Sequence, residues 1–580
     1  MKTEIILETV RHSLSHIMAA AVQELYPGVK FGIGPAIENG FYYDFALPSE
    51  ALAKEGLSLP KIELKMKEII KKDVVFKKKK ISKKEANKLF AKKPYKLELI
   101  KELKEKEISV YQSGNFIDLC KGPHVKSSKE IPLDSFKLTK LAGAYWRGSE
   151  KNPMLTRIYG LAFESKTKLD EYVKLQEEAE KRDHRILGQK LELFLIDEEV
   201  GAGLPIWLPK GAILRKIIED YLYQELTNQK YDWLYTPHIG NLNLWKTSGH
   251  WNFYKENMYS PIKIDEEEYL LKPMNCPFHV KAYNFKIRSY RDLPLFFAEL
   301  GTVYRYERSG TLHGLTRVRG FTQDDAHTIC TPKQMPEELA NLLEFALKVL
   351  KTFGFEEYTI YLSTKPEKYA GSDENWKKAT DTLKNVIENL KLSYKTDPGG
   401  GVFYGPKIDI KIKDSLQREW QCTTIQFDFN LPERFKMTYI DEKGKKQEPF
   451  MIHRAILGSM ERFIGVLLEH YAGNLPLWLS PVQVWVVPIG SDHRQYAEEV
   501  QKKLKSLGIR TEAKTEAETV SKKIREGEIQ KIPYILVVGD KEIKANSVRV
   551  RQRQKGDIGE IKFDEFIEKT ILEIEKKIIF

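Results

Sequence analysis

Charged side chains that suit a doubly charged ligand are concentrated in one stretch, residues 299–327. Two segments, Gly301–Tyr306 and Arg317–Asp325, alternate like strands, and the Ser-Gly and His-Gly pairs between them predict a long antiparallel hairpin. Arginine grips phosphate through paired hydrogen bonds and a carboxylate takes an ammonium, so the hairpin favours a ligand that is anionic at one end and cationic at the other. A solvated hairpin with charged faces is the alternative. The charged residues are Arg305, Arg308, Arg317, Arg319, Asp324, Asp325 and His327.

The length and composition indicate a globular protein of several domains. A chain of 580 residues is too long for one core, and we expect about three or four domains. With 42% hydrophobic and 30% charged residues, the chain has no run of roughly 18 apolar residues that could cross a bilayer. Arg11, His12 and His16 interrupt the apolar N-terminal segment, which argues against a signal peptide. We therefore predict a soluble protein with no membrane partner.

Cysteine usage and net charge indicate the compartment and the kind of partner. The four cysteines are too scattered for a disulfide framework and favour a reducing cytosol. A net charge of +12 and a pI near 9.0 suggest a polyanionic partner such as a nucleic acid. A lysine-rich proteome would produce the same charge, so the charge alone is weak support for RNA binding.

Histidine and cysteine gather in two segments of the N-terminal region. His12 and His16 lie four residues apart, on one face of the expected first helix. Asp118, Cys120 and His124 follow much later. These residue types could form a zinc site, although the spacing of the Cys-His loop is unusual for a structural finger. A helix whose histidines only flank a buried face is the simpler alternative.

The stretch 166–190 has the periodicity of a linker helix. Leu169, Tyr172, Leu175 and Ala179 fall along one stripe, and the segment contains no proline. His184 near its end is expected to be structural or exposed. After it, a helix is predicted over Gly211–Gln229 and a strand over 233–235.

The last hundred residues alternate between strand and helix patterns. This alternation predicts a small, mostly parallel α/β domain over 480–580. The expected strands are Val482–Pro488, Arg510–Ala513, Tyr534–Val538 and Ser547–Arg553, and the expected helices are Arg494–Ser506 and Thr519–Gln530.

Three stretches together resemble the class II aminoacyl-tRNA synthetases, in their threonyl version. The hairpin with its Gly-Phe-Thr-Gln-Asp-Asp-Ala-His run is similar to motif 2, the segment ending at Pro237 to motif 1, and Met451–Arg462 to motif 3. The resemblance implies a multidomain α+β protein: an antiparallel sheet flanked by helices, an N-terminal α+β editing domain and a C-terminal α/β anticodon-binding domain. The implied boundaries are 1–165 for editing, 166–190 for the linker helix, 191–475 for catalysis and 480–580 for the anticodon. No dinucleotide or Walker glycine signature is present.

The resemblance also implies a zinc-dependent threonine site. Cys276, His327 and His453 match the family's three zinc ligands, although they lie too far apart for a spacing rule to pair them. Three protein ligands leave one position open, and a zinc ion that holds the amino group and hydroxyl of threonine would reject valine, which an apolar pocket separates poorly.

The remaining catalytic-domain positions carry over one by one. Arg305 would hold the α-phosphate of ATP, Arg317 its phosphate tail, and Arg462 would stack on adenine. Asp325 would pair with the amino group of threonine, and His250 would assist transfer to the tRNA 3′ end. Mg²⁺ would accompany ATP. Further substrate contacts implied by the family are Met274, Phe321, Gln323, Tyr404, Lys407, Thr424 and Gln426.

The N-terminal motifs HSLSH, GPAIENGFYYDF, FIDLCKGPH and LAGAYWRG resemble the family's bacterial-type editing domain. A pocket gains only about 1–3 kcal/mol from the methyl group that separates threonine from serine, so a hydrolytic second sieve is expected. The implied pocket needs no metal. The chain begins shortly before it, so the ubiquitin-like domain common in the family is expected to be absent. The implied editing residues are His12, His16, Lys96, Asp118, Cys120 and His124, with Lys96 favoured over Lys93, and the anticodon residues are Glu542 and Arg551.

The resemblance therefore predicts a cytoplasmic, homodimeric threonine–tRNA ligase that uses ATP, threonine and tRNA(Thr) and hydrolyses mischarged Ser-tRNA(Thr). A seryl or prolyl enzyme of the same class is one alternative, against which the zinc-ligand set and the HSLSH cluster argue. A catalytically silent RNA-binding paralogue is another, and the intact Arg305 and Arg462 argue against it.

Overall fold

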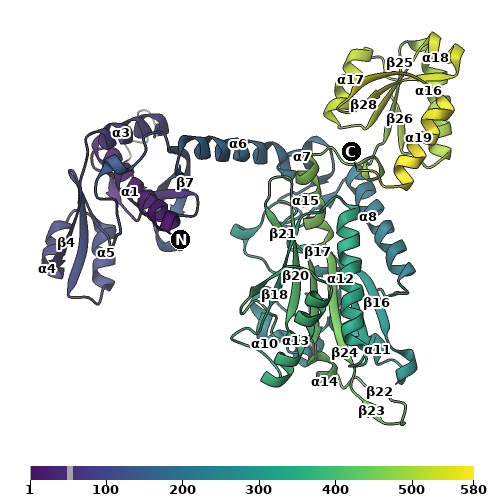
Figure 1. Ribbon diagram of the computed structural model, residues 1–580, viewed down its shortest axis with the longest axis horizontal. Helices are drawn as coiled ribbons and strands as arrows, with labels where there is room; N and C mark the ends of the chain where they lie inside the picture. The colour runs from purple at the N-terminus through teal and green to yellow at the C-terminus, as the bar shows by residue number, and fades with distance from the viewer. Residues whose placement is uncertain (1, 49–56, 580) are drawn as a thin grey trace. The chain divides into compact units, whose positions relative to one another are not determined.

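The computed structural model describes residues 2–48 and 57–579 (Figure 1). It divides into two compact units, Met1–Glu178 and Ala179–Phe580, here called the N-terminal and C-terminal units. Within the described residues, no helix combines the length and apolarity needed to cross a membrane.

In the N-terminal unit, helix α1 (Lys2–Leu25) lies against a five-stranded sheet. Leu14, Ile17 and Met18 are fully buried in the core that α1 shares with this sheet, which holds the intervening His16 inside the unit. The five strands are β1 (Lys30–Phe31), β2 (Ala36–Ile37), β3 (Gly40–Ala46), β7 (Phe136–Tyr145) and β8 (Met154–Ala162). A second sheet contains β4 (Phe76–Ser82), β5 (Glu107–Ser113) and β6 (Phe116–Leu119), and the other helices are α3 (Leu59–Lys71), α4 (Lys83–Leu89) and α5 (Pro94–Glu102).

The single linker helix predicted for 166–190 is wrong, because the structure has two helices there. These are α6 (Lys166–Arg182) and α7 (His184–Lys190). Asp183 separates them with non-helical backbone, and its carboxylate accepts a hydrogen bond from the Arg185 N–H as the N-cap of α7. An aspartate that caps a helix favours a new start over continuation, which explains the break.

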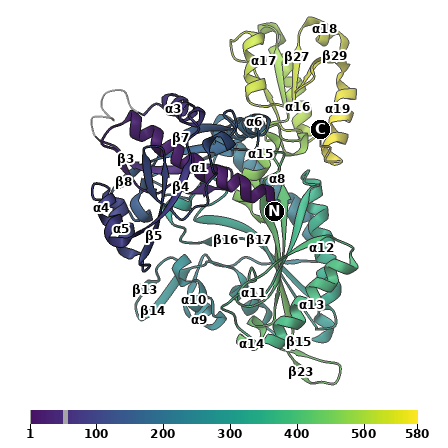
Figure 2. The same ribbon diagram turned by 60° about the vertical axis from the view of Figure 1, so that its left-hand side comes forward.

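The predicted antiparallel sheet is confirmed in the C-terminal unit (Figure 2). It has eight strands in the order β11-β16-β17-β24-β21-β20-β18-β19, and all pairs except the two at its edges are antiparallel. The strands are β11 (Asp232–Trp233), β16 (Leu295–Tyr304), β17 (Gly320–Cys330), β18 (Tyr358–Ser363), β19 (Tyr394–Asp397), β20 (Lys407–Lys413), β21 (Glu419–Asp428) and β24 (Phe450–Ser459).

Strand alternation divides this sheet into a core face and a polar face. Ile408, Ile410, Ile425 and Ile452 are fully buried in one core with apolar residues of the helices, while the residues between them face the other way. The helices that contribute are α8 (Pro209–Asn228), α12 (Met335–Thr352), α13 (Asp373–Asn389) and α15 (Met460–Tyr471) (Figures 1 and 2). The polar face is therefore free to form a site.

The predicted motif 2 hairpin is present, but its strands lie further from the turn than expected. β16 ends at Tyr304 and β17 begins at Gly320, so residues 305–319 form a long connection, here called the hairpin loop. The strands extend to Leu295 and Cys330 because the residues there are paired and Phe297, Ile329 and Cys330 are buried. Arg305 and Arg317 accordingly belong to the loop and not to the strands.

Smaller elements surround this sheet. One three-stranded sheet contains β12 (Ile239–Asn241), β13 (Ile262–Ile264) and β14 (Glu267–Leu271), and another contains β15 (Arg288–Ser289), β22 (Tyr439–Ile440) and β23 (Lys446–Gln447). A two-stranded sheet joins β9 (Phe194–Leu195) and β10 (Ile206–Trp207), and short helices are α9 (Asn243–Ser248), α10 (His250–Tyr254), α11 (Cys276–Tyr283) and α14 (Leu431–Arg434).

The C-terminal domain has a mixed sheet, so its predicted mostly parallel topology is only half correct. The order is β26-β25-β27-β28-β29, with two parallel and two antiparallel pairings. Parallel neighbours need a crossover of about a dozen residues or more, and the six-residue α18 between β27 and β28 is too short for that. The elements are β25 (Val484–Pro488), α16 (Arg494–Ser506), β26 (Thr511–Ala513), α17 (Val520–Ile529), β27 (Tyr534–Val538), α18 (Asp540–Ala545), β28 (Ser547–Gln552), β29 (Gly556–Lys562) and α19 (Phe563–Glu575).

Candidate functional site

Strand register places the polar residues of the C-terminal unit in two neighbouring rows across the sheet. Residues directly opposite each other on paired strands have Cβ atoms about 5 Å apart, so each row forms a continuous set of contacts. The first row runs Lys407, Gln426, His453, His327, and the second runs Asp409, Thr424, Ala455, Asp325, Glu299. Five strands, β16, β17, β20, β21 and β24, thus build one polar surface.

A cavity of about 360 Å³ opens over these rows. It is lined by all the predicted catalytic and substrate residues and by two of the three predicted zinc ligands, whereas His327 is fully buried beneath it. The predicted residues that line it are His250, Met274, Cys276, Arg305, Arg317, Phe321, Gln323, Asp325, Tyr404, Lys407, Thr424, Gln426, His453 and Arg462.

The two histidines of the first row have their protonation fixed by buried partners. Nε2 of His453 lies 2.8 Å from Oδ2 of Asp428, so its N–H donates to that carboxylate and Nδ1 keeps a lone pair. Nε2 of His279 donates to Glu299 at 3.2 Å, which leaves Nδ1 of His279 to accept from Nδ1–H of His327 at 2.8 Å. Nε2 of His327 therefore also carries a lone pair.

These two lone pairs face each other. Nε2 of His327 and Nδ1 of His453 are 2.9 Å apart, an unfavourable arrangement unless a cation or proton lies between them. Sγ of Cys276 joins them, since the ligand atoms of all three residues lie within 4.8 Å of one another. Burial raises the pKa of the Cys276 thiol well above its ordinary value. A thiol and two oriented imidazoles with hydrogen-bonded outer nitrogens fit a zinc ion, which would act as a Lewis acid toward an amine and a hydroxyl.

Asp325 and Asp324 lie on opposite faces of β17 and have different surroundings. Asp325 faces the cavity, where its Oδ2 accepts from Nδ2 of Asn275 at 3.0 Å, and burial raises its pKa. Asp324 points away and accepts backbone N–H groups of residues 456–458 at 2.8–3.1 Å, where the register with β24 shifts. Of the two aspartates on the hairpin, only Asp325, the one assigned to the ammonium of the substrate, faces the cavity, whereas Asp324 satisfies the backbone of a bulge.

The three predicted arginines line the cavity with different partners. Arg305 donates to the Pro273 carbonyl at 3.2 Å, with its guanidinium 5.2 Å from the centre of the Phe321 ring. Arg317 is half exposed and pairs with Glu307. Arg462 donates from Nε to the Thr316 carbonyl of the hairpin loop at 3.2 Å. Burial lowers the pKa of Arg462, and Arg305 lowers it further, so the site attracts anions.

His250 is a buried neutral imidazole at the edge of the cavity. Burial lowers its pKa to about 3. The Ser248 hydroxyl donates to the Trp245 carbonyl, so Nδ1–H of His250 donates to that hydroxyl oxygen at 2.8 Å. Nε2 is left as a hydrogen-bond acceptor. Elsewhere in the cavity, Lys407 pairs with Asp409 at 2.5 Å.

The predicted editing residues converge in the N-terminal unit. Ligand atoms of His12, His16, Cys120 and His124 lie within 4.8 Å of one another. Burial lowers the pKa of His124 to about 2 and that of His16 well below its ordinary value, and it raises the pKa of Cys120 to about 11. At neutral pH the cluster is therefore three neutral imidazoles and a thiol.

Two imidazole lone pairs aim at the Cys120 sulfur. Nδ1–H of His12 donates to the Pro123 carbonyl at 3.2 Å, which leaves Nε2 facing Sγ at 3.4 Å. The Ser13 hydroxyl donates to the Thr9 carbonyl, so Nδ1–H of His124 donates to Ser13 and its Nε2 faces Sγ at 3.2 Å. A thiol has one proton to donate, so one lone pair remains for another donor such as water.

Lys96 and Asp118 form a buried ion pair beside this cluster. Nζ of Lys96 is 2.5 Å from Oδ1 of Asp118, both side chains are almost fully buried, and the Tyr43 hydroxyl donates to Oδ2 at 2.5 Å. Lys93 instead donates to the Ile117 carbonyl. The structure thus brings Lys96, as expected, and not Lys93, to Asp118.

The two predicted anticodon residues lie in the C-terminal domain, on neighbouring elements. Glu542 is buried in α18, where its carboxylate accepts a hydrogen bond from the Gly539 N–H at 2.9 Å. Arg551 is half-buried on β28, 3.6 Å from Glu528.

Sequence reasoning missed the residues that orient the zinc-ligand histidines. No motif of the sequence assigns a role to His279, Glu299 or Asp428, yet these residues fix both imidazoles. One signal was available: Cys276 and His279 lie three residues apart, which places them on one face of α11. Nothing in the spacing of the other two indicates their role.

Three family models match the chain in the order of its domains. The model described as "Threonyl and Alanyl tRNA synthetase second additional domain" matches residues 108–159. The "tRNA synthetase class II core domain (G, H, P, S and T)" matches 259–471, and the "Anticodon binding domain" matches 483–573. The predicted fold class is thereby confirmed for all three parts.

Curated relatives and solved structures lead to the same family. A threonine–tRNA ligase of Sulfurihydrogenibium sp. (strain YO3AOP1) is 56% identical over 97% of this chain and 88% of its own length. One from Dehalococcoides mccartyi (strain CBDB1) is 52% identical over 98% and 97%. The RNA binding domain of threonyl-tRNA synthetase from Cryptosporidium parvum has a TM-score of 0.65 at 42% identity, covering 67% of this chain and 98% of that one. Prolyl-tRNA synthetase from the same organism, at 19% identity and a TM-score of 0.53 over 68% and 75%, shares the fold. The chain therefore belongs to the threonyl-tRNA synthetase family.

Proposed function

We propose that this protein is a threonine–tRNA ligase whose cavity joins threonine to AMP and then to the 3′ end of tRNA(Thr). The observation that carries the proposal is the cavity itself. It combines a buried carboxylate, a Cys-His-His set with two facing lone pairs, and arginines at the hairpin loop and at α15. A ligand with an ammonium and a hydroxyl at one end and phosphates at the other complements this order of charges.

In the first step a carboxylate oxygen of threonine attacks the α-phosphorus of ATP. A P–O bond forms, the bond to the bridging oxygen of the β-phosphate breaks, and pyrophosphate leaves. Mg²⁺ bound to ATP would offset the charge of its phosphates. Asp325 holds the ammonium of threonine, and Arg305 stabilises the charge that develops on the α-phosphate. Arg317 exchanges its Glu307 partner for the phosphate tail, and Arg462 and Phe321 hold adenine. Met274, Gln323, Tyr404, Lys407, Thr424 and Gln426 complete the walls around the substrates.

In the second step the tRNA 3′-terminal adenosine hydroxyl attacks the threonyl carbonyl. The bond from that carbonyl carbon to the phosphate oxygen of AMP breaks, and the hydroxyl proton leaves with the AMP phosphate. His250 lines the cavity as a neutral imidazole with its Nε2 free to accept, because its Nδ1–H is held by Ser248. Its low pKa makes it a weak base, so we assign it the role of orienting the hydroxyl through a hydrogen bond.

We propose that Cys276, His327 and His453 hold one zinc ion. The ion would supply a Lewis acid that recognises the amino group and hydroxyl of threonine, and valine would leave it unsatisfied. His279 and Asp428 keep both imidazole lone pairs directed at the site, and this orientation supports metal binding.

The His/Cys cluster is proposed to hydrolyse Ser-tRNA(Thr). A lone pair on His12 or His124 that the thiol of Cys120 leaves free can accept a hydrogen bond from water and orient it toward the ester. His16 and the Lys96–Asp118 pair form the buried wall. The donor set would also suit a metal by ligand type, and zinc analysis distinguishes the two cases.

We extend the proposal to the domains and partners. Residues 1–165 edit, 166–190 connect, 191–475 catalyse, and 480–580 bind the anticodon through Glu542 and Arg551. A second copy of the chain would pair through the motif 1 region, where Tyr235 is 90% exposed. A large exposed aromatic side chain within that region is typical of a subunit contact. The proposed location is the cytoplasm.

The decisive experiment is ATP–pyrophosphate exchange with threonine, serine or valine, on protein of measured zinc content. Strong exchange with threonine, weaker exchange with serine and none with valine is the expected result. A zinc-loaded protein that exchanges with none of them, yet binds tRNA, would instead be a silent paralogue and would overturn the proposal.

A further inference from the structure

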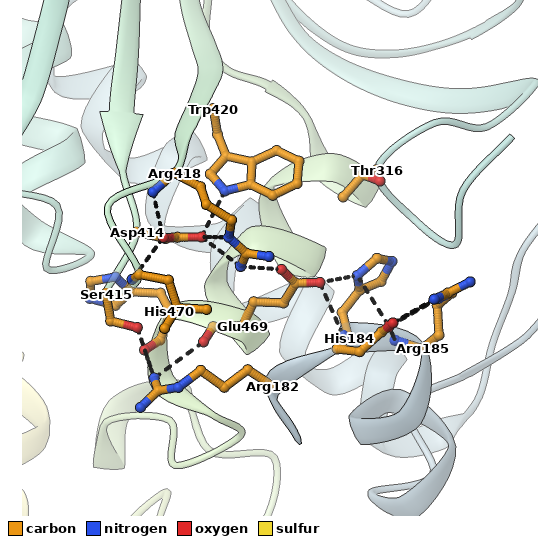
Figure 3. Close-up of polar contacts among 12 residues, drawn as sticks. Arg182, His184, Arg185, Thr316, Asp414, Ser415, Arg418, Trp420, Glu469 and His470 are labelled. Carbon is orange, nitrogen blue, oxygen red and sulfur yellow. Dashed lines mark hydrogen bonds and ion pairs between the residues drawn. The ribbon is translucent and has the colours of Figure 1, made fainter. Parts of the chain in front are cut away.

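A buried histidine connects α7, the second helix of the linker segment, to the hairpin loop. His184 is the first residue of α7, is fully buried, and lies between α15 and residues 314–315 of the loop. Figure 3 shows its imidazole beside the Glu469 carboxylate, with Thr316 drawn above them. This residue lies outside the cavity lining and has no role in the proposed mechanism.

Both ring nitrogens of His184 are committed, and their roles are fixed. Nε2 accepts the backbone N–H of Leu315 at 2.9 Å, so it carries no proton. Nδ1 is therefore protonated and donates to Oε1 of Glu469 at 2.6 Å. The neighbouring Asp183 carboxylate is occupied by the Arg185 N–H and guanidinium. Asp183, His184 and Glu469 have the right types for a metal site, but these hydrogen bonds leave no free imidazole lone pair for an ion.

Glu469 is itself held in place from the far side. Its Oε2 accepts from Nη2 of Arg418 at 2.6 Å, and Arg418 also pairs with Asp414, which accepts from Nε1 of Trp420 at 2.9 Å (Figure 3). Burial raises the pKa of Glu469, but the hydrogen bond from His184 and the charge of Arg418 outweigh it and the net pKa is lowered. The carboxylate is thus an anchored acceptor, and the imidazole orientation is fixed by it.

The hairpin loop lies directly on this imidazole. Gly314 has a positive φ of 48°, and a Cβ at this position would lie 2.1 Å from Nε2 of His184. Leu315 is fully buried, and the next residue, Thr316, offers its carbonyl to Nε of Arg462 at 3.2 Å. Arg317 follows at once. A shift of the Leu315 N–H would therefore move both the partner of Arg462 and the backbone of Arg317.

We infer that His184 is a positioning residue for the ATP end of the cavity. It fixes the hairpin loop through one backbone hydrogen bond, and through the loop it places Arg317 and Arg462. This inference rests on the proposed roles of these two arginines toward ATP. The threonine end of the cavity depends on other residues, so ATP recognition is affected selectively.

Two substitutions separate the two hydrogen bonds of the ring. In His184→Asn, the amide nitrogen can replace Nδ1 as donor to Glu469, but nothing reaches the Leu315 N–H. In His184→Gln, the longer amide can place its oxygen near Nε2 and restore the acceptor for Leu315. Loss of one hydrogen bond to a buried amide changes an equilibrium by about tenfold. We expect KM for ATP in pyrophosphate exchange to rise about tenfold in His184→Asn and to remain within about threefold in His184→Gln.

His470→Gln is the matched control, because His470 follows Glu469 directly and its Nδ1 has no hydrogen-bond partner within the described residues. It should leave KM for ATP unchanged. KM for threonine and zinc content are measured in all four proteins and should agree between the two His184 variants. A thermal unfolding scan of each protein checks that it is folded at the assay temperature, and His184→Asn, which leaves the buried Leu315 N–H without an acceptor, should have the lower midpoint of the two. Equal ATP KM values for His184→Asn and His184→Gln, or a parallel rise in the threonine KM, would overturn the inference. Were the wild type to show no exchange, the proposed function would fail. The inference would then be decided by titration with a fluorescent ATP analogue, which should bind about tenfold more weakly to His184→Asn only.

Discussion

Replacing Asp325 by asparagine should remove threonine recognition without harming the fold. The substitution preserves shape and keeps an oxygen for the Asn275 amide, which lies 3.0 Å from the carboxylate. The only property that it changes is the negative charge, which is the property that an ammonium ligand needs. Because burial raises the pKa of Asp325, the charged form is a cost to the folded protein, and a neutral amide relieves it.

The magnitude follows from the surroundings of this carboxylate. Asp325 is 9% exposed and lies in the second row, two residues from His327 along β17. Leaving a buried charge without its partner costs about 3–5 kcal/mol. Every 1.4 kcal/mol is a factor of ten, so kcat/KM for threonine should fall by roughly a hundredfold to several thousandfold. KM for ATP should change by less than about threefold, because the phosphates are held by arginines at the other end.

The assay is pyrophosphate exchange at varied threonine and fixed ATP, together with a thermal unfolding scan. Asp324→Asn is the control, since Asp324 accepts three backbone N–H groups on the opposite face of the same strand. That variant should lose about 2 kcal/mol of stability and keep its threonine KM within about threefold. If Asp325→Asn retained more than a tenth of the wild-type kcat/KM for threonine, or lowered the thermal midpoint as Asp324→Asn does, the reasoning about this pocket would be wrong.

Three further predictions test the other sites. Cys276→Ser should lower bound zinc well below one per chain and reduce threonine activation with it, whereas the control Cys120→Ser should leave the zinc content unchanged. Loss of zinc in Cys120→Ser would instead place the metal in the editing cluster. In the wild type, burial holds the pKa of His124 at about 2, whereas in the unfolded chain it is near 6.5, so lowering the pH from 7 to 5 protonates only the unfolded state. The free energy of unfolding of the wild type should thereby fall by about 2 kcal/mol relative to that of His124→Asn. The difference between the thermal midpoints of the two proteins at pH 7 and pH 5 measures this change, and a difference that does not depend on pH would contradict it. Arg551→Ala should raise KM for tRNA about tenfold in aminoacylation while exchange is unchanged, and Arg549→Ala, which removes an exposed partner of Asp557, should do neither; equal effects would point to general phosphate attraction.

Local patterns alone were sufficient for many of the elements. The strand over 534–538 and the helix over 494–506 agree with the prediction residue for residue, because each is short, strongly periodic and bounded by turn residues. The fold class and the family followed from motif resemblance. The break at Asp183 was missed because charged helical periodicity runs through it, although an aspartate before a helix start is a known signal. β29 and α19 were not predicted, although Phe563, Phe566 and Ile567 fall at helical spacing on one buried face of α19 and would have indicated that helix.

The amino-acid sequence by itself determined which residue types are available: the arginines, the zinc-ligand types and the editing cluster. Only the tertiary structure decided which of them meet. The register of β17, β21 and β24 puts His327, His453 and Gln426 in one row, and one residue of slip would turn each side chain to the core face. The same register sends Asp324 away from the ligand, and a shared contact between α7 and α15 assigns His184 its partners. These outcomes depend on pairings between distant segments, and no local pattern encodes them.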